Sequence, residues 1–434
     1  MANPAMSVSP YWELTFDADG DVRGRQRDRL LSGVAEHGIR DLVVFAHGWN
    51  NDRPMANRLY SAFFAPMPGL APRARLGYVG VLWPSMRFAD EAIPDFPRTV
   101  AATEARGPAL DKDTRHALLG AFPGRATVVD QLARLLDQQP REDAELAEFG
   151  RLVRLLVEVV APGPQALFAA DTVAEGVPQD EPRMFSDPVP AVCEEFARAL
   201  SAGRHPALSL PNPWEGAQEL LRQATYYAMK RRAGTVGERG LGTVLGQLAG
   251  TRSELRVHLV GHSFGARLVS FALRGLPEGV RTVKSVTLLQ GAFSHYAFAA
   301  RLPHATQESG MLHGQQNRID GPLVCAHSRH DGALATFYPL ASRMAGDDRG
   351  IAAPDVGSAL RERWGALGYG GIRGVPGTRA LRLAEALNKP APRAGCVNVD
   401  AAAVVRRGGA PSGAHSDILH PELARLVLAA GRIT

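Results

Sequence analysis

The stretch that decides the fold is VHLVGHSFGARLV, residues 257–269. An apolar, β-type run ends at Gly261, Ser263 follows two residues later, and a second glycine, Gly265, leads into a segment with helical spacing. Glycine loses more backbone freedom on folding than any other residue, so two glycines around one serine need a local geometric reason. A sharp turn from strand to helix supplies one, because small residues two positions either side of a strained apex prevent collisions with neighbouring chain. The stretch therefore predicts a tight strand–turn–helix unit with Ser263 at its apex.

Short apolar runs and helical patterns alternate along most of the chain. Most of the runs are continuous rather than alternating in hydrophobicity, as a parallel sheet covered on both faces requires. This alternation predicts an α/β fold with a doubly wound, mostly parallel sheet. The expected strands are residues 41–46, 77–82, 255–260, 283–289, 322–326 and 396–401, with an early edge strand at 11–16. The expected helices are residues 23–37, 215–232, 266–274, 333–344 and 421–430.

The alternation breaks between about residues 88 and 213. This region has helix-like stretches at residues 128–138 and 142–160, separated by connectors that contain proline and glycine. A loop of that length without secondary structure is uncommon, so we expect a mainly helical insertion. The predicted organisation is an N-terminal part of the core at residues 1–90, a helical insertion or lid at 91–213, and a C-terminal part of the core at 214–434.

Composition and targeting signals indicate an ordinary globular protein. The chain has 434 residues, of which 45% are hydrophobic and 21% charged, enough to bury a sizeable core. The sequence shows neither a leader peptide nor an apolar run long enough to cross a bilayer, so we expect a cytoplasmic protein without a transmembrane segment. The cysteines Cys193, Cys325 and Cys396 lie far apart, and their spacing predicts neither disulfides nor a zinc site.

The net charge of +5 comes mainly from arginine. The densest basic cluster, residues 230–232, could attract an anionic substrate, a phospholipid or nucleic acid. It lacks interleaved aromatic residues and any nucleic-acid motif, so we interpret it as a solvated helix end and expect no nucleic-acid partner.

Ser263 needs a base and an acid to act as a nucleophile, because a serine hydroxyl is unreactive at neutral pH. In folds with a nucleophile elbow the chain order is serine, acid, histidine. Asp331 follows the predicted strand at 322–326, and His415 follows a glycine-rich loop after the last strand, so these are the candidate acid and base. Asp331 could instead only cap the helix that follows it, and the alternatives are Asp320 or Asp400 as the acid and His420 as the base.

Other groups near these motifs have simpler interpretations. His327 and His330 with Asp331 have a spacing that could suggest metal ligands, but no further cluster completes a site, so we expect no metal and no cofactor. We interpret His262, directly before Ser263, as a packing residue. A tetrahedral intermediate would also need hydrogen-bond donors at its oxygen. The expected donors are the backbone N–H groups of Phe264 and of Trp49, in the sharp turn at residues 47–51.

Five motifs together resemble the α/β-hydrolase superfamily: AHGWNN (46–51), VLWPS (81–85), VGHSFGARLV (260–269), HSRHDGAL (327–334) and AHSDI (414–418). The first two are similar to its esterase- or lipase-like bacterial families. The resemblance covers the chain from about residue 40 to its end. It implies Ser263, Asp331 and His415 as catalytic residues and Trp49 and Phe264 as oxyanion donors. The long insertion before the nucleophile departs from the pattern and leaves the lid and the substrate open.

The resulting expectation is a serine hydrolase that cleaves a small-molecule carboxylic ester or a lipid ester through an acyl-enzyme. An amidase, thioesterase or acyltransferase with the same triad, or a non-catalytic binding protein of this fold, remains the alternative. Trp83 and Phe293 are the candidate substrate-binding residues, although aromatic residues of this kind also form plain core.

Overall fold

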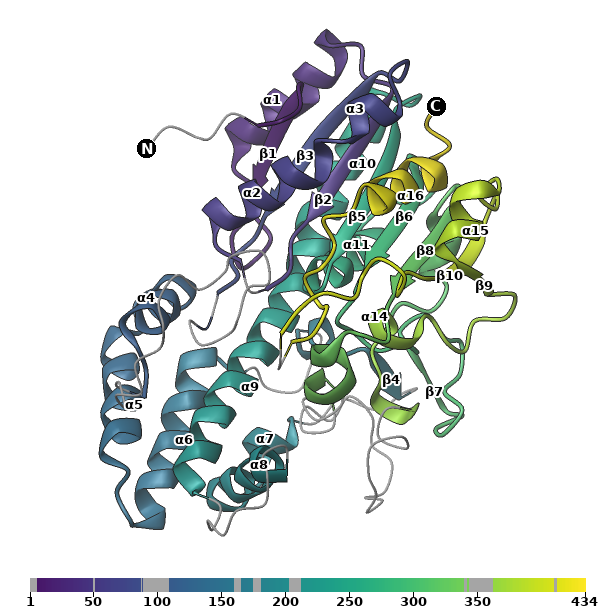
Figure 1. Ribbon diagram of the computed structural model, residues 1–434. Coiled ribbons are helices and arrows are strands. Elements are labelled where there is room, and N and C mark those ends of the chain that lie inside the picture. Colours follow the sequence, from purple (N-terminus) through teal and green to yellow (C-terminus); the bar gives the residue numbers. More distant parts are fainter. Residues whose placement is uncertain are drawn as a thin grey trace.

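The computed structural model describes residues 6–49, 51–86, 88, 109–159, 165–174, 181–202, 212–338, 342, 362–409 and 412–434. In this part of the chain, eight parallel strands form one sheet flanked by helices (Figure 1). The order across the sheet is β1 (Tyr11–Thr15), β3 (Leu76–Leu82), β2 (Asp41–Ala46), β5 (Arg256–His262), β6 (Val283–Leu289), β8 (Pro322–His327), β10 (Gly395–Asp400) and β9 (Arg379–Arg382). The predicted α/β class, parallel sheet and edge strand β1 are confirmed, whereas β9 was not expected.

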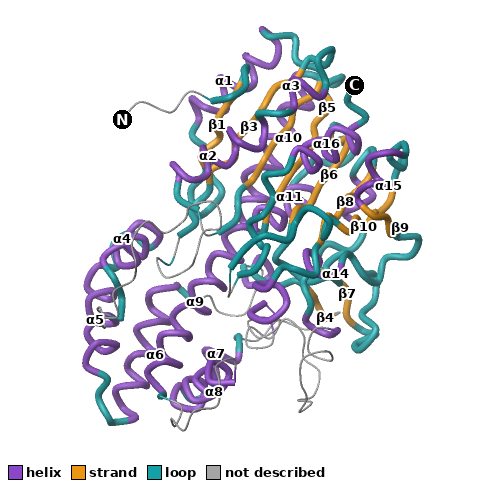
Figure 2. The backbone as a smooth tube through the Cα atoms, in the orientation of Figure 1, coloured by secondary structure: helices purple, strands orange, loops and turns teal. Residues whose placement is uncertain are grey.

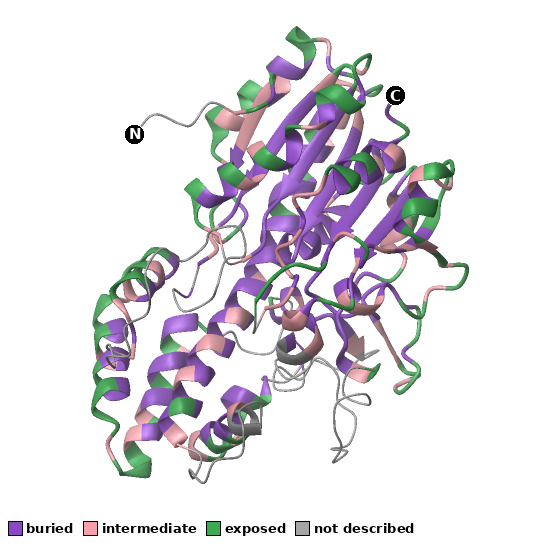
Figure 3. Cartoon of the chain, viewed as in Figure 1, coloured by how far each residue is buried: buried purple, intermediate pink, exposed green. Residues whose placement is uncertain are grey.

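The sheet separates two apolar cores, because consecutive residues of a strand point to opposite faces. In β2, Leu42 and Val44 belong to one core and Val43 and Phe45 to the other. The first core includes side chains from helices α1 (Gly24–Glu36), α10 (Gly242–Thr251) and α11 (Phe264–Arg274). The second takes α2 (Arg53–Phe64), α3 (Met67–Leu70), α15 (Leu383–Asn388) and α16 (Pro421–Gly431). Figure 3 shows the consequence, a sheet whose central strands are buried along their length.

A helical region lies between β3 and β5 in the sequence and extends beyond one end of the sheet (Figure 2). The helices expected at residues 128–138 and 142–160 are α5 (Ala126–Gln138) and α6 (Asp143–Val157). The region also contains α4 (Lys112–Ala121), η1 (Ala166–Phe168), α7 (Arg183–Ser186) and α8 (Val189–Ala202). The long helix α9 (Pro213–Thr235) contacts α6 and α8 on one side and α11 on the other, and it continues through η2 (Val236–Leu241) into α10. The insertion is thus joined to the core by a helix that packs on the helix of the elbow.

Several short elements were not expected. The strand β4 (Thr172–Ala174) pairs antiparallel with β7 (Glu308–Gly310) outside the main sheet. Between the later strands lie η3 (Gln315–Arg318), η4 (Ala333–Phe337) and α14 (Leu367–Gly370). The helix expected at 333–344 is described as η4, and most of the residues after Tyr338 in that prediction lie outside the described part of the chain. None of the helices in the described ranges is both long and apolar enough for a membrane crossing.

The interpretation of residues 230–232 as a solvated helix end is wrong. Helix α9 continues to Thr235, and Lys230 and Arg232 are only 1% and 7% exposed. The reason is tertiary: this part of α9 lies between the insertion and α11, which a local charge pattern does not reveal. Burial lowers the pKa of Arg232 to about 10, and its Nη1 has no hydrogen-bond partner among the described residues. Its guanidinium lies over the ring of Phe122, 4.7 Å from the ring centre.

Candidate active site

Ser263 occupies a strained turn between β5 and α11. Its backbone angles, φ 55° and ψ −120°, are unfavourable for a residue with a side chain and typically cost about 1–3 kcal/mol. A Cβ on Gly265 would lie 1.9 Å from the carbonyl oxygen of Ala46, and one on Gly261 would lie 2.3 Å from that of Gly265. Both glycines are therefore required by close backbone approach, and the turn presents the serine side chain at the carboxyl end of the sheet.

Ser263, His415 and Asp331 form a connected hydrogen-bond chain. His415 Nε2 lies 2.9 Å from Ser263 Oγ, and His415 Nδ1 lies 2.7 Å from Asp331 Oδ2. An ionised carboxylate can only accept, so Nδ1 carries the proton and Nε2 is left to accept the serine hydroxyl hydrogen. The three residues follow β5, β8 and β10, and the carboxyl ends of parallel strands meet at one edge of a sheet. The structure thus brings together the three predicted residues.

Asp331 is fully buried and serves two purposes. Its Oδ1 accepts from the backbone N–H of Leu334 at 3.0 Å, which caps the turn that follows, while Oδ2 faces His415. The side-chain amide of Gln290 also donates to Oδ2, at 3.1 Å. Asp331 therefore caps the following turn and also faces His415, so the two predicted roles do not exclude each other.

The other candidates for acid and base have different partners. Asp320 pairs with Lys284 on the surface, and Asp400 accepts from the backbone N–H of Ala402. His420 Nε2 lies 2.8 Å from Asp417 Oδ1. Of these candidates, Asp331 and His415 are the ones that belong to the hydrogen-bond chain ending at Ser263.

The loop that carries His415 is held by backbone contacts and by His262. Gly413 bridges to Asp331, and the N–H of Ala414 donates to the carbonyl oxygen of His330 at 2.9 Å. His262 Nε2 donates to the carbonyl oxygen of His415 at 2.9 Å. Burial is the main cause that lowers the pKa of His262 to about 3, so this side chain is a neutral donor at neutral pH. It is buried as expected, but it also holds the backbone of the histidine loop.

The turn after β2 lies directly against Ser263. A Cβ on Gly48 would come within 2.9 Å of Ser263 Cβ. The backbone N–H groups of Trp49 and Phe264, the expected oxyanion donors, have no acceptor among the residues that the structure describes. Two backbone N–H groups without an acceptor in this part of the chain are what a developing oxyanion at Ser263 would need.

His47 fixes the orientation of the peptide that carries the Trp49 N–H. His47 Nδ1 donates to the carbonyl oxygen of Gly48 at 2.7 Å. In a planar trans peptide the C=O and N–H point in opposite directions, so this bond directs the Trp49 N–H away from His47. Burial lowers the pKa of His47 to about 4, which keeps the ring neutral. The indole of Trp83 stacks on it at 5.6 Å and donates to the His47 carbonyl oxygen at 3.0 Å.

Trp83 and Phe293 are buried rather than exposed toward a pocket. Their exposed fractions are 4% and 0%. Trp83 supports His47, and Phe293 packs on Phe298 with ring centres 6.2 Å apart. Aromatic side chains do lie beside the elbow: Tyr226 is 4.6 Å from Phe264 and 5.5 Å from Trp49, measured between ring centres.

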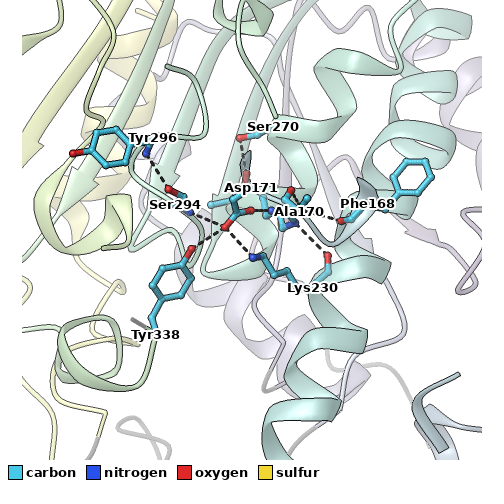
Figure 4. Close-up of polar contacts among 10 residues, drawn as sticks. Phe168, Ala170, Asp171, Lys230, Ser270, Ser294, Tyr296 and Tyr338 are labelled. Atoms are coloured by element: carbon cyan, nitrogen blue, oxygen red, sulfur yellow. Dashed lines mark hydrogen bonds and ion pairs between the residues drawn. The ribbon is translucent and has the colours of Figure 1, made fainter. Parts of the chain in front are cut away.

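A buried ionic cluster joins the insertion to the elbow helix (Figure 4). Its centre is Asp171, which is fully buried and pairs with Arg267 of α11 and with Lys230 Nζ at 3.0 Å. The same carboxylate accepts from the Tyr338 hydroxyl at 2.8 Å and from the Ser294 backbone N–H at 2.9 Å. Arg267 follows Ser263 by one helical turn, so this cluster connects the insertion to the helix after Ser263 and to the segment after Asp331.

Sequence reasoning missed the supporting roles of His47, Gln290 and Asp171. The histidine before Gly48 in AHGWNN was a usable signal, because a side chain next to a sharp turn can bond its backbone. Gln290 directly follows a predicted strand whose carboxyl end lies at the site. Asp171 sits in a region with no strong pattern.

No family model, curated protein or solved structure matches this chain. The candidate site belongs to an α/β fold with a parallel sheet, and it joins a hydroxyl, an imidazole and a buried carboxylate.

Proposed function

We propose that the chain is a serine hydrolase of the α/β-hydrolase type that cleaves carboxylic esters. The observation that carries the proposal is the continuous path from Ser263 Oγ through His415 to Asp331, with distances of 2.9 and 2.7 Å. The strained turn at Ser263 supports the same chemistry, as do the N–H groups of Trp49 and Phe264, for which the described residues provide no acceptor. The chain order of serine, acid and histidine is also the order of that fold.

In the proposed reaction Ser263 Oγ attacks the ester carbonyl carbon while His415 Nε2 takes the hydroxyl proton. The Asp331 carboxylate accepts from Nδ1 and stabilises the imidazolium. The negative oxygen of the tetrahedral intermediate accepts from the N–H groups of Trp49 and Phe264. When the intermediate collapses, the C–O bond to the alcohol breaks and the leaving oxygen takes the proton from Nε2.

The acyl-enzyme is then hydrolysed by the reverse use of the same groups. Water attacks the acyl carbon, His415 Nε2 accepts one of its protons, and the second intermediate forms in the same oxyanion site. Collapse breaks the bond to Ser263 Oγ, which recovers the proton, and the carboxylic acid leaves. The aromatic surroundings formed by Trp49, Tyr226 and Phe264 favour an ester with an apolar acyl or alcohol part.

Fluorophosphonate labelling tests the proposal directly. The wild type should be labelled at Ser263, and Ser263→Ala should not. Ser270→Ala is the matched control, because Ser270 is a buried serine on the same helix whose hydroxyl bonds the carbonyl oxygen of Ala266. It should be labelled like the wild type.

A panel of p-nitrophenyl esters of increasing chain length, with matched amides and thioesters, then separates the ester reaction from its alternatives. A folded wild type that is neither labelled nor active on the panel would favour a binding protein. Preference for the thioester or amide would correct the substrate class while leaving the nucleophile in place.

A further inference from the structure

Gln290 is a buried polar residue next to the proposed catalytic acid. It directly follows β6, is 1% exposed and has a left-handed backbone with φ 46°. Its Nε2 lies 3.1 Å from Asp331 Oδ2. Its Oε1 is buried and has no hydrogen-bond partner among the described residues. The side chain thus makes one directed contact, and that contact is to the acid of the triad.

This arrangement is unfavourable for stability on two counts. Residues other than glycine adopt left-handed angles at a cost, and asparagine and aspartate do so more readily than glutamine. A buried carbonyl oxygen without a donor also carries a desolvation penalty. An apolar side chain of the same length would avoid the second cost. Violations of this kind are expected where a residue serves function.

The contact determines how the carboxylate of Asp331 is held. Oδ1 accepts from the Leu334 N–H, so rotation of the carboxylate is restrained at that oxygen. Oδ2 accepts from both His415 Nδ1 and Gln290 Nε2. The amide therefore competes mildly with the imidazole for the same oxygen and disperses part of its negative charge. A carboxylate relieved of that donor would attract a protonated His415 more strongly.

The other ionisable groups around Asp331 and His415 are buried and neutral, exposed to solvent, or paired elsewhere. His262, from β5, lies with its ring 5.2 Å from that of His415, and His47 lies in the turn after β2. Burial lowers the pKa of His262 to about 3 and that of His47 to about 4, so both are neutral above about pH 5 and add no charge beside His415. His330, beside Asp331, is exposed, and Asp417, after His415, is paired with His420.

We infer that Gln290 is a positioning residue that aims the Asp331 carboxylate at His415 and sets the pH at which His415 becomes an active base. This inference rests on the proposed function. Gln290 would touch neither the substrate nor the reacting atoms and would act only through Asp331.

Two substitutions remove the contact in different ways. Gln290→Met keeps the length and has no donor. Gln290→Asn keeps an amide but withdraws it by one methylene, and asparagine tolerates the left-handed backbone. Thr287→Val is the matched control, because Thr287 is fully buried on β6, the strand just before Gln290, and its hydroxyl also has no partner among the described residues.

The measurement is the second-order rate of fluorophosphonate labelling at Ser263 as a function of pH. Both Gln290 variants should react about tenfold more slowly at the plateau, the loss expected for one charge-assisted contact. The midpoint of their acid limb should rise by about half a pH unit, because the less dispersed carboxylate stabilises protonated His415. The downfield Nδ1–H resonance of His415 should titrate with the same shift. Thr287→Val should keep the wild-type rate and midpoint.

Denaturant titration separates positioning from structural support. Gln290→Met should unfold at the wild-type midpoint or above it, since the buried orphan oxygen is gone, while its labelling slows. Wild-type rates and pH midpoints in a folded Gln290 variant would overturn the inference. Should Gln290→Met not fold, Gln290→Asn decides in its place. Absence of labelling at Ser263 in the wild type would instead overturn the proposed function.

Discussion

Acid should destabilise this protein well before its carboxylates are protonated, because several imidazoles are buried in the neutral form. Burial is the main cause that lowers the pKa of His47 to about 4, and those of His262 and His295 to about 3. His295 is pushed down further by the nearby charge of Arg373, and His262 by His415. In the unfolded chain each imidazole has a pKa of about 6.5.

The sign follows from proton binding. Between pH 6.5 and about 4 the unfolded chain takes up protons that the folded protein does not bind, so stability is full above about 6.5 and falls as the pH falls. At pH 5 each neutral imidazole costs about 2 kcal/mol relative to neutral pH. The loss summed over His47, His262 and His295 is about 6 kcal/mol, a large part of a typical free energy of unfolding of about 5–15 kcal/mol. The pKa values of His258 and His327 are also lowered, mainly by burial, and act in the same direction.

Urea unfolding followed by tryptophan fluorescence at pH 7.5, 6 and 5 measures this loss. His295→Phe is the informative variant, because its imidazole contacts the Glu362 carbonyl oxygen at 3.0 Å and lies outside the proposed triad. It should lose about 2 kcal/mol less than the wild type between pH 7.5 and 5. His116→Asn, at an exposed position of α4, should keep the wild-type dependence. Equal unfolding free energies of the wild type at pH 7.5 and 5, or an unchanged dependence in His295→Phe, would refute the reasoning.

Three further outcomes are expected. Gly48→Ala places a Cβ 2.9 Å from Ser263 Cβ and should slow fluorophosphonate labelling about 100-fold, with little change in the unfolding midpoint. A labelling rate near that of the wild type would count against this close approach. Arg232→Met removes a buried guanidinium whose lowered pKa of about 10 corresponds to a penalty of about 3 kcal/mol, and it also loses the contact with Phe122, so urea unfolding should show a net stabilisation of about 1–2 kcal/mol. Arg231→Met should instead destabilise the protein, because it loses the hydrogen bond to the Glu158 carbonyl oxygen. Asp171→Asn leaves Arg267 and Lys230 without their shared carboxylate and should cost about 3–5 kcal/mol in the same assay, against less than about 1 kcal/mol for Ser270→Ala.

The central strands of the sheet were predictable because they are buried on both faces. Strands β2 and β6 have the bounds that their apolar runs indicate, since a strand covered on both faces must be apolar at consecutive positions. Strand β9 has the sequence RALR and is largely exposed at the edge, so no apolar run marks it. The three-residue strands β4 and β7 are too short for any period to show.

The residues that meet at the candidate site were predictable for a different reason. No side chain fits at Gly265, because its Cβ would lie 1.9 Å from the Ala46 carbonyl oxygen, so the required glycine is visible in the sequence. The loops that follow parallel strands also lie at one edge of the sheet. Burial of single side chains leaves no such mark. Lys230 and Arg232 are charged yet enclosed by helices from distant parts of the chain, and Trp83 and Phe293 are aromatic in the same way whether they line a pocket or a core.

The same physical cause links the proposed site to its expected sensitivity to acid. His47 and His262 each donate one N–H to a backbone carbonyl oxygen, and these carbonyls belong to the turn with Trp49 and to the loop with His415. A neutral imidazole with one proton can hold such a peptide in a single orientation only while that tautomer persists. Burial keeps each imidazole neutral, because a second proton would place a charge inside the protein. The low pKa values that result favour the unfolded chain in acid, because its imidazoles can bind that proton. Part of the stability below about pH 6 is therefore lost through the two side chains that orient the turn with Trp49 and the loop with His415. A variant of either residue with better acid tolerance should also be slower in the proposed reaction.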